Sequence, residues 1–164
     1  MKKITMTDAL KQTSPHPVSL ISSQRPDGGT NLAAVSWWTY LESEPSYIGF
    51  TMWNKSYTCE LVLKTGKAAL SIPGEAIADI TLKCGTVSGR DVDKVKEYDI
   101  KLFDAPVKFP LHSRLAFSCT VENKVEVGEC VFFICKVDEV FFDESQKQIF
   151  AWGGSDTLAP LPKG

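Results

Sequence analysis

Three short segments carry the side chains of this chain that are best suited to bind a ligand. The first, residues 54–58, has the sequence Asn-Lys-Ser-Tyr-Thr and precedes a run that ends at Gly66. Its cap-type residues predict a short helix that begins near Ser56. The free N–H groups of a helix start, with the hydroxyls of Ser56 and Thr58 and the ammonium of Lys55, could bind a phosphate. Spacing alone favours the simpler interpretation, an ordinary helix cap beside a solvated lysine.

The second segment, residues 84–94, has the sequence Cys-Gly-Thr-Val-Ser-Gly-Arg-Asp-Val-Asp-Lys. It combines two glycines with hydroxyls and cations, so its backbone could form a concave anion site in which Ser88, Arg90 and Lys94 add donors. Taken alone, the loop is better explained as a surface loop with an aspartate N-cap and ordinary ion pairs.

The third segment, residues 30–39, contains small residues that would let a flat ligand lie against a strand. Asn31 offers both a donor and an acceptor, which suits the edge of a heteroaromatic ring. The alternative is an ordinary strand that packs Trp37 into the core, as most tryptophans do.

Composition and missing motifs exclude several classes of protein. A net charge of −2 from 18 basic and 20 acidic residues argues against nucleic-acid binding, and no apolar run approaches a membrane span. The chain has no P-loop, no Rossmann glycine motif and no nucleophile elbow. Five cysteines without a CxxC pair and only two histidines argue against a metal site and indicate reduced thiols in the cytoplasm. The N-terminus lacks the apolar segment of a secretory signal.

The periodicity predicts a mostly β protein of one domain, residues 1–164, with a loosely structured tail from about residue 153. A turn is expected at residues 25–29, a helix from Ser56 to Gly66, a second helix at 75–83 and a helical turn at 91–98. Many strands with few short helices indicate a closed barrel with helical insertions. The expected strands are 18–23, 30–41, 46–53, 67–72, 115–127, 130–142 and 149–152.

In order and spacing, the three segments resemble those of the flavin reductase-like, FMN-binding split-barrel proteins, particularly the flavoredoxin-type branch. The resemblance runs from about Val18 to Trp152, and the S-G-R-D-x-D-K loop is its most specific part. It implies a six-stranded antiparallel split barrel of Greek-key type with a few short helices. It also implies non-covalent FMN at the interface of a homodimer.

The resemblance also assigns cofactor-binding residues. Those along the flavin ring are Asn31, Ser36 and Trp37. Those at the phosphate and ribityl chain are Lys55, Ser56 and Thr58. Those in the loop that closes over the phosphate are Ser88, Arg90 and Lys94. Trp152, at the end of the last strand, is expected to cover the flavin, from the same subunit or from its neighbour.

One departure concerns a late strand. Many relatives have Gly-Asp-His at its start, with the histidine close to the flavin, whereas this chain has Gly128-Glu129-Cys130. A thiol cannot replace the imidazole as a donor or proton relay at neutral pH, so this departure argues against NAD(P)H-dependent reduction. It does not argue against FMN binding, which depends on the other segments. Cys130 is expected as a small hydrophobic residue near the flavin, and a redox thiol is the alternative.

The implied function is flavin-dependent electron transfer in which no side chain is an essential acid or base. The enzyme version is a flavin reductase that uses NAD(P)H as a transient reductant. The carrier version keeps FMN bound and exchanges electrons with a redox protein. Alternatives are a flavin-free structural or binding module, or a pyridoxamine- or haem-handling barrel, and the scarcity of histidines argues against haem.

Overall fold

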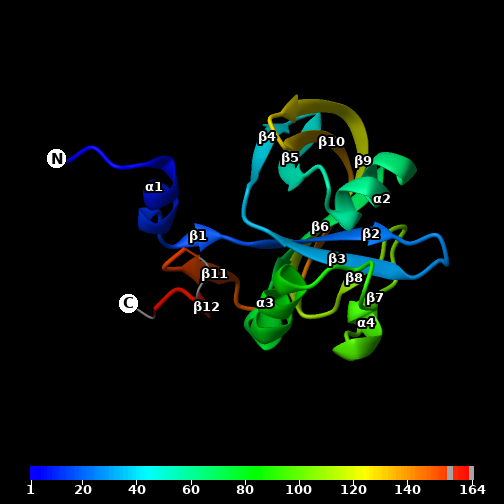
Figure 1. Cartoon of the computed structure of the whole chain (residues 1–164). Coiled ribbons are helices and arrows are strands. Elements are labelled where there is room, and N and C mark those ends of the chain that lie inside the picture. Colours follow the sequence, from blue (N-terminus) through cyan, green and yellow to red (C-terminus); the bar gives the residue numbers. More distant parts are fainter. Residues whose placement is uncertain (155–156, 163–164) are drawn as a thin grey trace.

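The computed structural model describes residues 1–154 and 157–162, and its largest element is a curved antiparallel sheet of seven strands (Figure 1). The strand order is β3-β2-β6-β9-β10-β5-β4. The bounds are β2 (Ser19–Gln24), β3 (Thr30–Val35), β4 (Trp38–Ser43), β5 (Ser46–Trp53), β6 (Lys67–Pro73), β9 (Ser113–Val127) and β10 (Cys130–Phe142).

Smaller elements surround this sheet. A three-stranded sheet joins β1 (His16–Pro17), β11 (Ile149–Trp152) and β12 (Thr157–Pro160), and a short ribbon joins β7 (Leu102–Phe103) and β8 (Phe109–Pro110). The helices are α1 (Met6–Gln12), α2 (Tyr57–Thr65), α3 (Ala78–Thr86) and α4 (Lys94–Glu97), with a 3-10 turn, η1 (Glu75–Ile77), before α3. None of the helices in the described part of the chain is long and apolar enough to cross a membrane.

The mostly β architecture is confirmed, but a closed barrel of six strands is not. Residues 30–41, expected as one strand, are interrupted at Ser36 and Trp37, where the chain crosses from one edge of the sheet to the other. β3 therefore lies at one edge beside β2, and β4 lies at the opposite edge beside β5. Because of this crossing, the segment expected as one strand forms two, β3 and β4, and the described sheet has seven strands. The two edge strands do not pair with each other, so the sheet is not a closed barrel.

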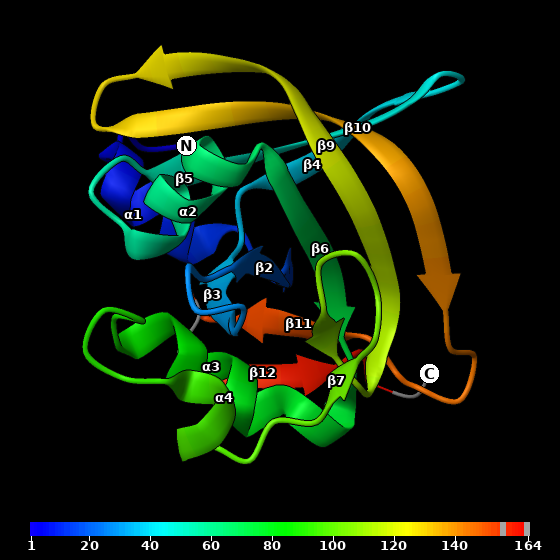
Figure 2. The ribbon, with the colours of Figure 1, turned by 90° about the vertical axis from the view of Figure 1, so that its right-hand side faces the viewer.

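Two apolar cores lie on the two faces of the β2–β3 pair. Helix α2 lies within the curve of the sheet (Figure 2). The larger core includes Cys59 and Val62 of this helix. The smaller core joins Leu20 and Leu32 of the β2–β3 pair to Cys84 of α3. The β2–β3 pair is thus held between α2 on one face and the α3–α4 region on the other.

Helix α2 has the ends that its sequence predicts. The Ser56 hydroxyl accepts a hydrogen bond from the Cys59 N–H at 3.2 Å, which caps the N-terminus. Gly66 ends the helix with φ of 67°, and its N–H donates to the Val62 carbonyl at 2.9 Å. Glycine adopts this left-handed conformation without a steric penalty.

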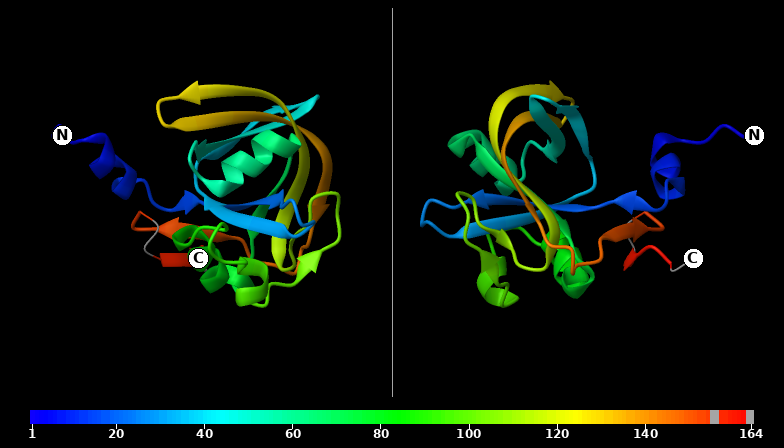
Figure 3. Two further views of the ribbon diagram at one scale, coloured as in Figure 1. Left: turned by 45° about the vertical axis from the view of Figure 1, so that its right-hand side comes forward. Right: turned by 180° about the vertical axis from the view of Figure 1, so that it is seen from behind.

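Both ends of the chain lie on the same side of the molecule (Figure 3). Helix α1, which the sequence did not predict, buries none of its residues. In the tail expected to be loose, β12 pairs with β11 from Trp152↔Thr157 to Ile149↔Pro160. Residues 155–156 and 163–164 of that tail lie outside the described residues.

Candidate functional site

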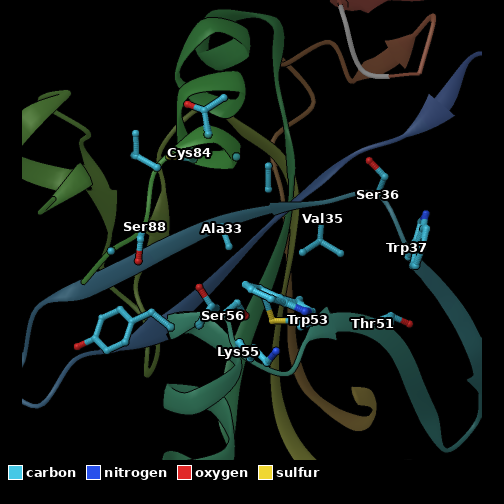
Figure 4. A pocket seen from close by; sticks show the side chains of 18 of the residues that line it. Ala33, Val35, Ser36, Trp37, Thr51, Trp53, Lys55, Ser56, Cys84 and Ser88 are labelled. Atoms are coloured by element: carbon cyan, nitrogen blue, oxygen red, sulfur yellow. The ribbon is translucent and has the colours of Figure 1, made fainter. Parts of the chain in front are cut away.

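A cavity of about 630 Å³ lies between strand β3, the start of α2 and the loop that follows α3 (Figure 4). It joins the three segments that the sequence singled out, although they are far apart along the chain. The predicted residues that line it are Ser36, Trp37, Lys55, Ser56, Thr58, Ser88, Arg90 and Lys94.

Asn31 lies behind one wall of the cavity. It is 3% exposed, and its Nδ2 atom donates to the Thr58 hydroxyl oxygen at 2.7 Å. Because that oxygen acts as the acceptor, the O–H of Thr58 is free to donate elsewhere. Gly89 packs so closely on Asn31 that a Cβ atom there would overlap the Asn31 Oδ1 atom and lie 3.1 Å from Tyr57 Cδ1. The Asn31–Thr58 pair thus requires glycine in the facing loop.

The start of α2 presents backbone donors at the cavity. Among the described residues, the N–H groups of Tyr57 and Thr58 have no hydrogen-bond acceptor, whereas the Cys59 N–H is capped by Ser56. Unpaired N–H groups at a helix start carry partial positive charge and bind anions well.

Lys94 brings a buried positive charge to the same cavity. The residue is 4% exposed, and its ammonium donates to the backbone carbonyls of Leu32 at 2.7 Å and Cys84 at 2.8 Å. No carboxylate of the described residues forms an ion pair with it. Burial lowers the pKa of the Lys94 ammonium, and burial also raises the pKa of the Cys84 thiol to about 11. The one remaining N–H of the ammonium and its uncompensated charge suit an anion.

Arg90 fastens the loop to α2. Its guanidinium donates to the Lys55 carbonyl at 3.0 Å and pairs with the Glu60 carboxylate at 2.7 Å. The guanidinium also lies over the Tyr57 ring, 5.3 Å from its centroid. The Ser88 hydroxyl accepts from the Arg90 N–H at 3.2 Å and tightens the turn. Arg90 therefore holds the loop in place, and the Glu60 carboxylate largely compensates its positive charge.

Lys55 stands at the exposed rim. It forms an ion pair of 3.5 Å with Glu129 and lies over the Trp53 ring, 5.6 Å from its centroid. Among the described residues that line the cavity, none is an aspartate or a glutamate. The cavity is therefore positively charged at the end where α2 and Lys94 meet.

The other end of the cavity is aromatic. Ser36 and Trp37 lie in the connection between β3 and β4, and Thr51 and Trp53 face them from β5 (Figure 4). Trp37 and Trp53 are each 51% exposed. Trp37 thus does not pack into the core as a strand tryptophan usually does, and its ring is open to a partner or ligand.

Comparison with known proteins places the chain in a family. Residues 12–158 match the model of the flavin reductase like domain. The chain belongs to the flavin reductase-like family. This membership confirms the expectation from the three segments and supports a flavin-related oxidoreductase role.

Individual relatives share either part of the sequence or the fold. The uncharacterized protein YddH of Escherichia coli (strain K12) is 36% identical over 77 residues, which are 47% of this chain and 41% of YddH. The match thus spans less than half of YddH. Two solved structures, each 20% identical, show the same fold. The flavoredoxin of Desulfovibrio vulgaris (Miyazaki F) has a TM-score of 0.85, with 100% of this chain and 95% of that chain covered. An FMN-binding protein from Thermus thermophilus, with 1-cyclohex-2-enone bound, has a TM-score of 0.80, with 98% of each chain covered.

Three residues that the family resemblance assigned do not line the cavity of this flavin reductase-like chain: Asn31, which lies behind its wall, Cys130 and Trp152. Cys130 is partly buried at the start of β10, opposite Trp53 of β5. Trp152 is partly buried on β11, and its ring N–H donates to the Ala159 carbonyl of β12 at 3.2 Å. Coverage of a flavin by Trp152 of a neighbouring subunit stays a prediction.

Sequence reasoning missed the residues that the two chain ends bring to the cavity. These are Leu10, Thr13, His16 and Gly154. The sequence did not predict helix α1, because this helix buries no apolar face and therefore has no marked hydrophobic periodicity. The two prolines around His16 were a usable signal, because they indicate an extended and rigid position.

Proposed function

We propose that this chain binds FMN non-covalently in the cavity and uses it for electron transfer, as a flavin reductase or as a flavoredoxin-like carrier. The observation that carries the proposal is the buried Lys94 ammonium, which has no carboxylate partner among the described residues and lines the same cavity as the open N-terminus of α2. A dianionic phosphate would satisfy both groups.

The donors at the charged end fit a phosphate. The N–H groups of Tyr57 and Thr58, the Thr58 hydroxyl and the remaining Lys94 N–H would hold it. Charge-assisted bonds of this kind are stronger than neutral ones. Ser56 and Ser88 would serve the ribityl hydroxyls from the same rim.

The wall along β3 fits a flat ring. The short side chains of Ala33 and Val35 leave this wall flat. β3 is an edge strand, so its outer backbone groups, apart from the Leu32 carbonyl that Lys94 occupies, are available to ring heteroatoms. The ring would extend from the charged end toward Ser36 and Trp37. The names of the Desulfovibrio flavoredoxin and the Thermus FMN-binding protein agree with this cofactor.

Bound FMN would accept two electrons and a proton as hydride from NAD(P)H, or electrons from a redox protein, and pass them to an acceptor. The chain's residues would bind and orient the cofactor. No side chain is assigned as an essential acid or base.

A homodimer is part of the proposal, because an apolar face of the sheet continues from the aromatic end of the cavity. Trp53 and Val127 lie opposite Cys130, and Val125 lies opposite Phe132, so their side chains share one face of β5, β9 and β10. Val125 and Val127 are 47% and 60% exposed. A second copy of the chain would cover this face and close the open end of the cavity.

A cytoplasmic location is proposed as well. All five cysteines are free, and four of them are buried. Free thiols suit a reducing compartment.

Titration of the purified protein with FMN and with riboflavin tests the cofactor proposal. FMN should bind more tightly, because only FMN carries the phosphate. At 100 times the dissociation constant, FMN should stabilise the fold by about 2.7 kcal/mol, seen as a higher melting temperature. A colourless protein with no thermal shift would instead support a flavin-free binding module.

An NADH oxidation assay with excess free FMN separates the two versions of the function. Steady turnover supports the reductase. No turnover, together with reversible reduction of the bound flavin, supports the carrier.

A further inference from the structure

His16 lines the aromatic end of the cavity, far from the anion-binding end. The β2–β3 register pairs Ser19 with Val35, so the chain just before β2 lies beside the chain just after β3. Asn31, at the charged end, is four residues from Val35, which is roughly 13 Å along a strand. His16 is therefore too distant to serve the phosphate and must face a different part of the bound molecules.

The protonation pattern of the His16 ring follows from its one hydrogen bond. The Nδ1 atom lies 3.0 Å from the Pro17 carbonyl oxygen. A carbonyl can only accept, so Nδ1 carries the hydrogen, and in the neutral ring Nε2 is left as an acceptor. Among the described residues, Nε2 has no hydrogen-bond partner.

The backbone holds His16 rigidly. Pro15 and Pro17 flank it, and proline restricts both its own φ and the conformation of the residue before it. His16 also pairs with Ala151 in the small sheet. The ring thus belongs to a fixed, half-buried position rather than to a mobile terminus.

The surroundings of His16 suit an uncharged planar group. Trp37 is 51% exposed, and Leu10 and Thr13 of the N-terminal segment line the same cavity. A ligand here would stack a ring on an aromatic surface and direct an N–H or O–H donor to the imidazole.

We propose that His16 is a substrate-binding residue whose Nε2 atom accepts a hydrogen bond from the carboxamide N–H of a dihydronicotinamide reductant. This inference rests on the proposed function and adds the recognition element for the electron donor. The carboxamide is a neutral N–H donor on a flat ring, which is the chemistry that a neutral imidazole beside Trp37 would select.

The test compares two reductants on the FMN-loaded protein under anaerobic conditions. 1-Benzyl-1,4-dihydronicotinamide carries the carboxamide without a dinucleotide tail, and dithionite carries neither. In His16→Leu, the concentration of the dihydronicotinamide that gives half the maximal reduction rate should rise about tenfold, as expected for one lost hydrogen bond. His16→Gln, which restores an acceptor, should recover most of the loss. Gln12→Leu, at an exposed residue of α1 that does not line the cavity, should behave like the wild type.

Reduction by dithionite and the affinity for FMN should be the same in all variants. Equal loss with both reductants, or weaker FMN binding in His16→Leu, would show that His16 supports the cofactor or the fold and would overturn the proposal. Bound FMN that dithionite reduces and the dihydronicotinamide does not would also overturn it, while leaving FMN binding intact. A wild-type protein that takes up no FMN would overturn the proposed function itself, before any reductant is added.

Discussion

Lys94 combines near-complete burial with a charge that no described carboxylate compensates. Replacement by methionine keeps the length of the side chain and removes its donors. A lost hydrogen bond to a charged group costs about 1.5–3 kcal/mol, so FMN affinity should fall roughly ten- to hundredfold. Riboflavin affinity, measured by the same fluorescence titration, should change much less. Equal weakening of both ligands would contradict a phosphate contact at Lys94.

The pH dependence of binding follows from the same residue. Burial lowers the pKa of Lys94 below its ordinary value of 10.5, so in the free protein the ammonium loses its proton earlier than in the unfolded chain. In the window between the lowered pKa and 10.5, the unfolded chain binds more protons, and the stability of the free protein should rise with pH. FMN affinity should fall over the same window, because the charge that attracts the phosphate is lost. Calorimetric titrations of FMN at several alkaline pH values, with Lys94→Met as the control that lacks this titrating group, would measure this.

Gly89 is a second residue of the site that a substitution can test, because the structure leaves no space for a Cβ atom there. A Cβ atom there would overlap Asn31 Oδ1, whereas a Cβ at Gly85 would only approach the Ala34 Cβ at 3.3 Å. Gly89→Ala should therefore displace the loop, break the bond from Asn31 to Thr58 and weaken FMN binding at least tenfold. Gly85→Ala, in the same wall, should have a much smaller effect in the same titration. Similar affinities for the two variants would show that the loop does not depend on close packing at Gly89.

The residues of the site were only partly predictable. The segments around Thr58 and Lys94 have recognisable composition, but spacing alone favoured ordinary caps and ion pairs. Sequence does not reveal that Lys94 is buried, because it follows two aspartates and resembles a surface lysine. Its burial depends on the carbonyls of Leu32 and Cys84, which only the folded chain brings together.

At the scale of elements, α2 links stability to binding through its cap. Ser56→Ala removes the acceptor for the Cys59 N–H and should cost about 1 kcal/mol, seen as a lower melting temperature. Ser56→Asp keeps an acceptor and places a favourable charge at the helix start, so the free protein should be at least as stable as the wild type. The same carboxylate should repel the phosphate and weaken FMN more than riboflavin. Tighter FMN binding in Ser56→Asp would place the phosphate elsewhere.

Most elements followed from local signals, and the exceptions have physical causes. Ser56 and Gly66 carry the cap chemistry that defines α2, and β10 and β11 have the bounds that their apolar runs predict. The break between β3 and β4 has no glycine or proline to signal it. There the chain crosses from one edge of the sheet to the other, with Trp37 exposed and Trp38 packed against the larger core.

At the scale of the molecule, the apolar face that includes Val125 and Val127 predicts a dimer. Paired Val125→Glu and Val127→Glu substitutions should yield a folded monomer in sedimentation experiments, because both side chains are exposed in the single chain. Val140→Glu provides the matched control. It is 57% exposed and lies toward the other end of β10, so the dimer should persist. A wild-type chain that sediments as a monomer at micromolar concentration would contradict the proposed interface.

The sequence predicts the fold class correctly, but it does not predict whether the sheet closes into a barrel. Alternating runs and turn residues indicate an antiparallel β protein, and the three segments identify its family. Whether the edges of the sheet meet depends on pairing between distant strands, which no local pattern encodes. The placement of the N-terminal segment at the cavity likewise depends on the pairing of His16 with Ala151.

The most direct test is a crystal structure of the protein grown with FMN. The phosphate should lie within hydrogen-bond distance of the Thr58 N–H and hydroxyl and of Lys94 Nζ, with the flavin ring along Ala33 and Val35. A flavin bound in the reverse orientation, with its phosphate at Trp37, or bound outside this cavity, would contradict the central claim.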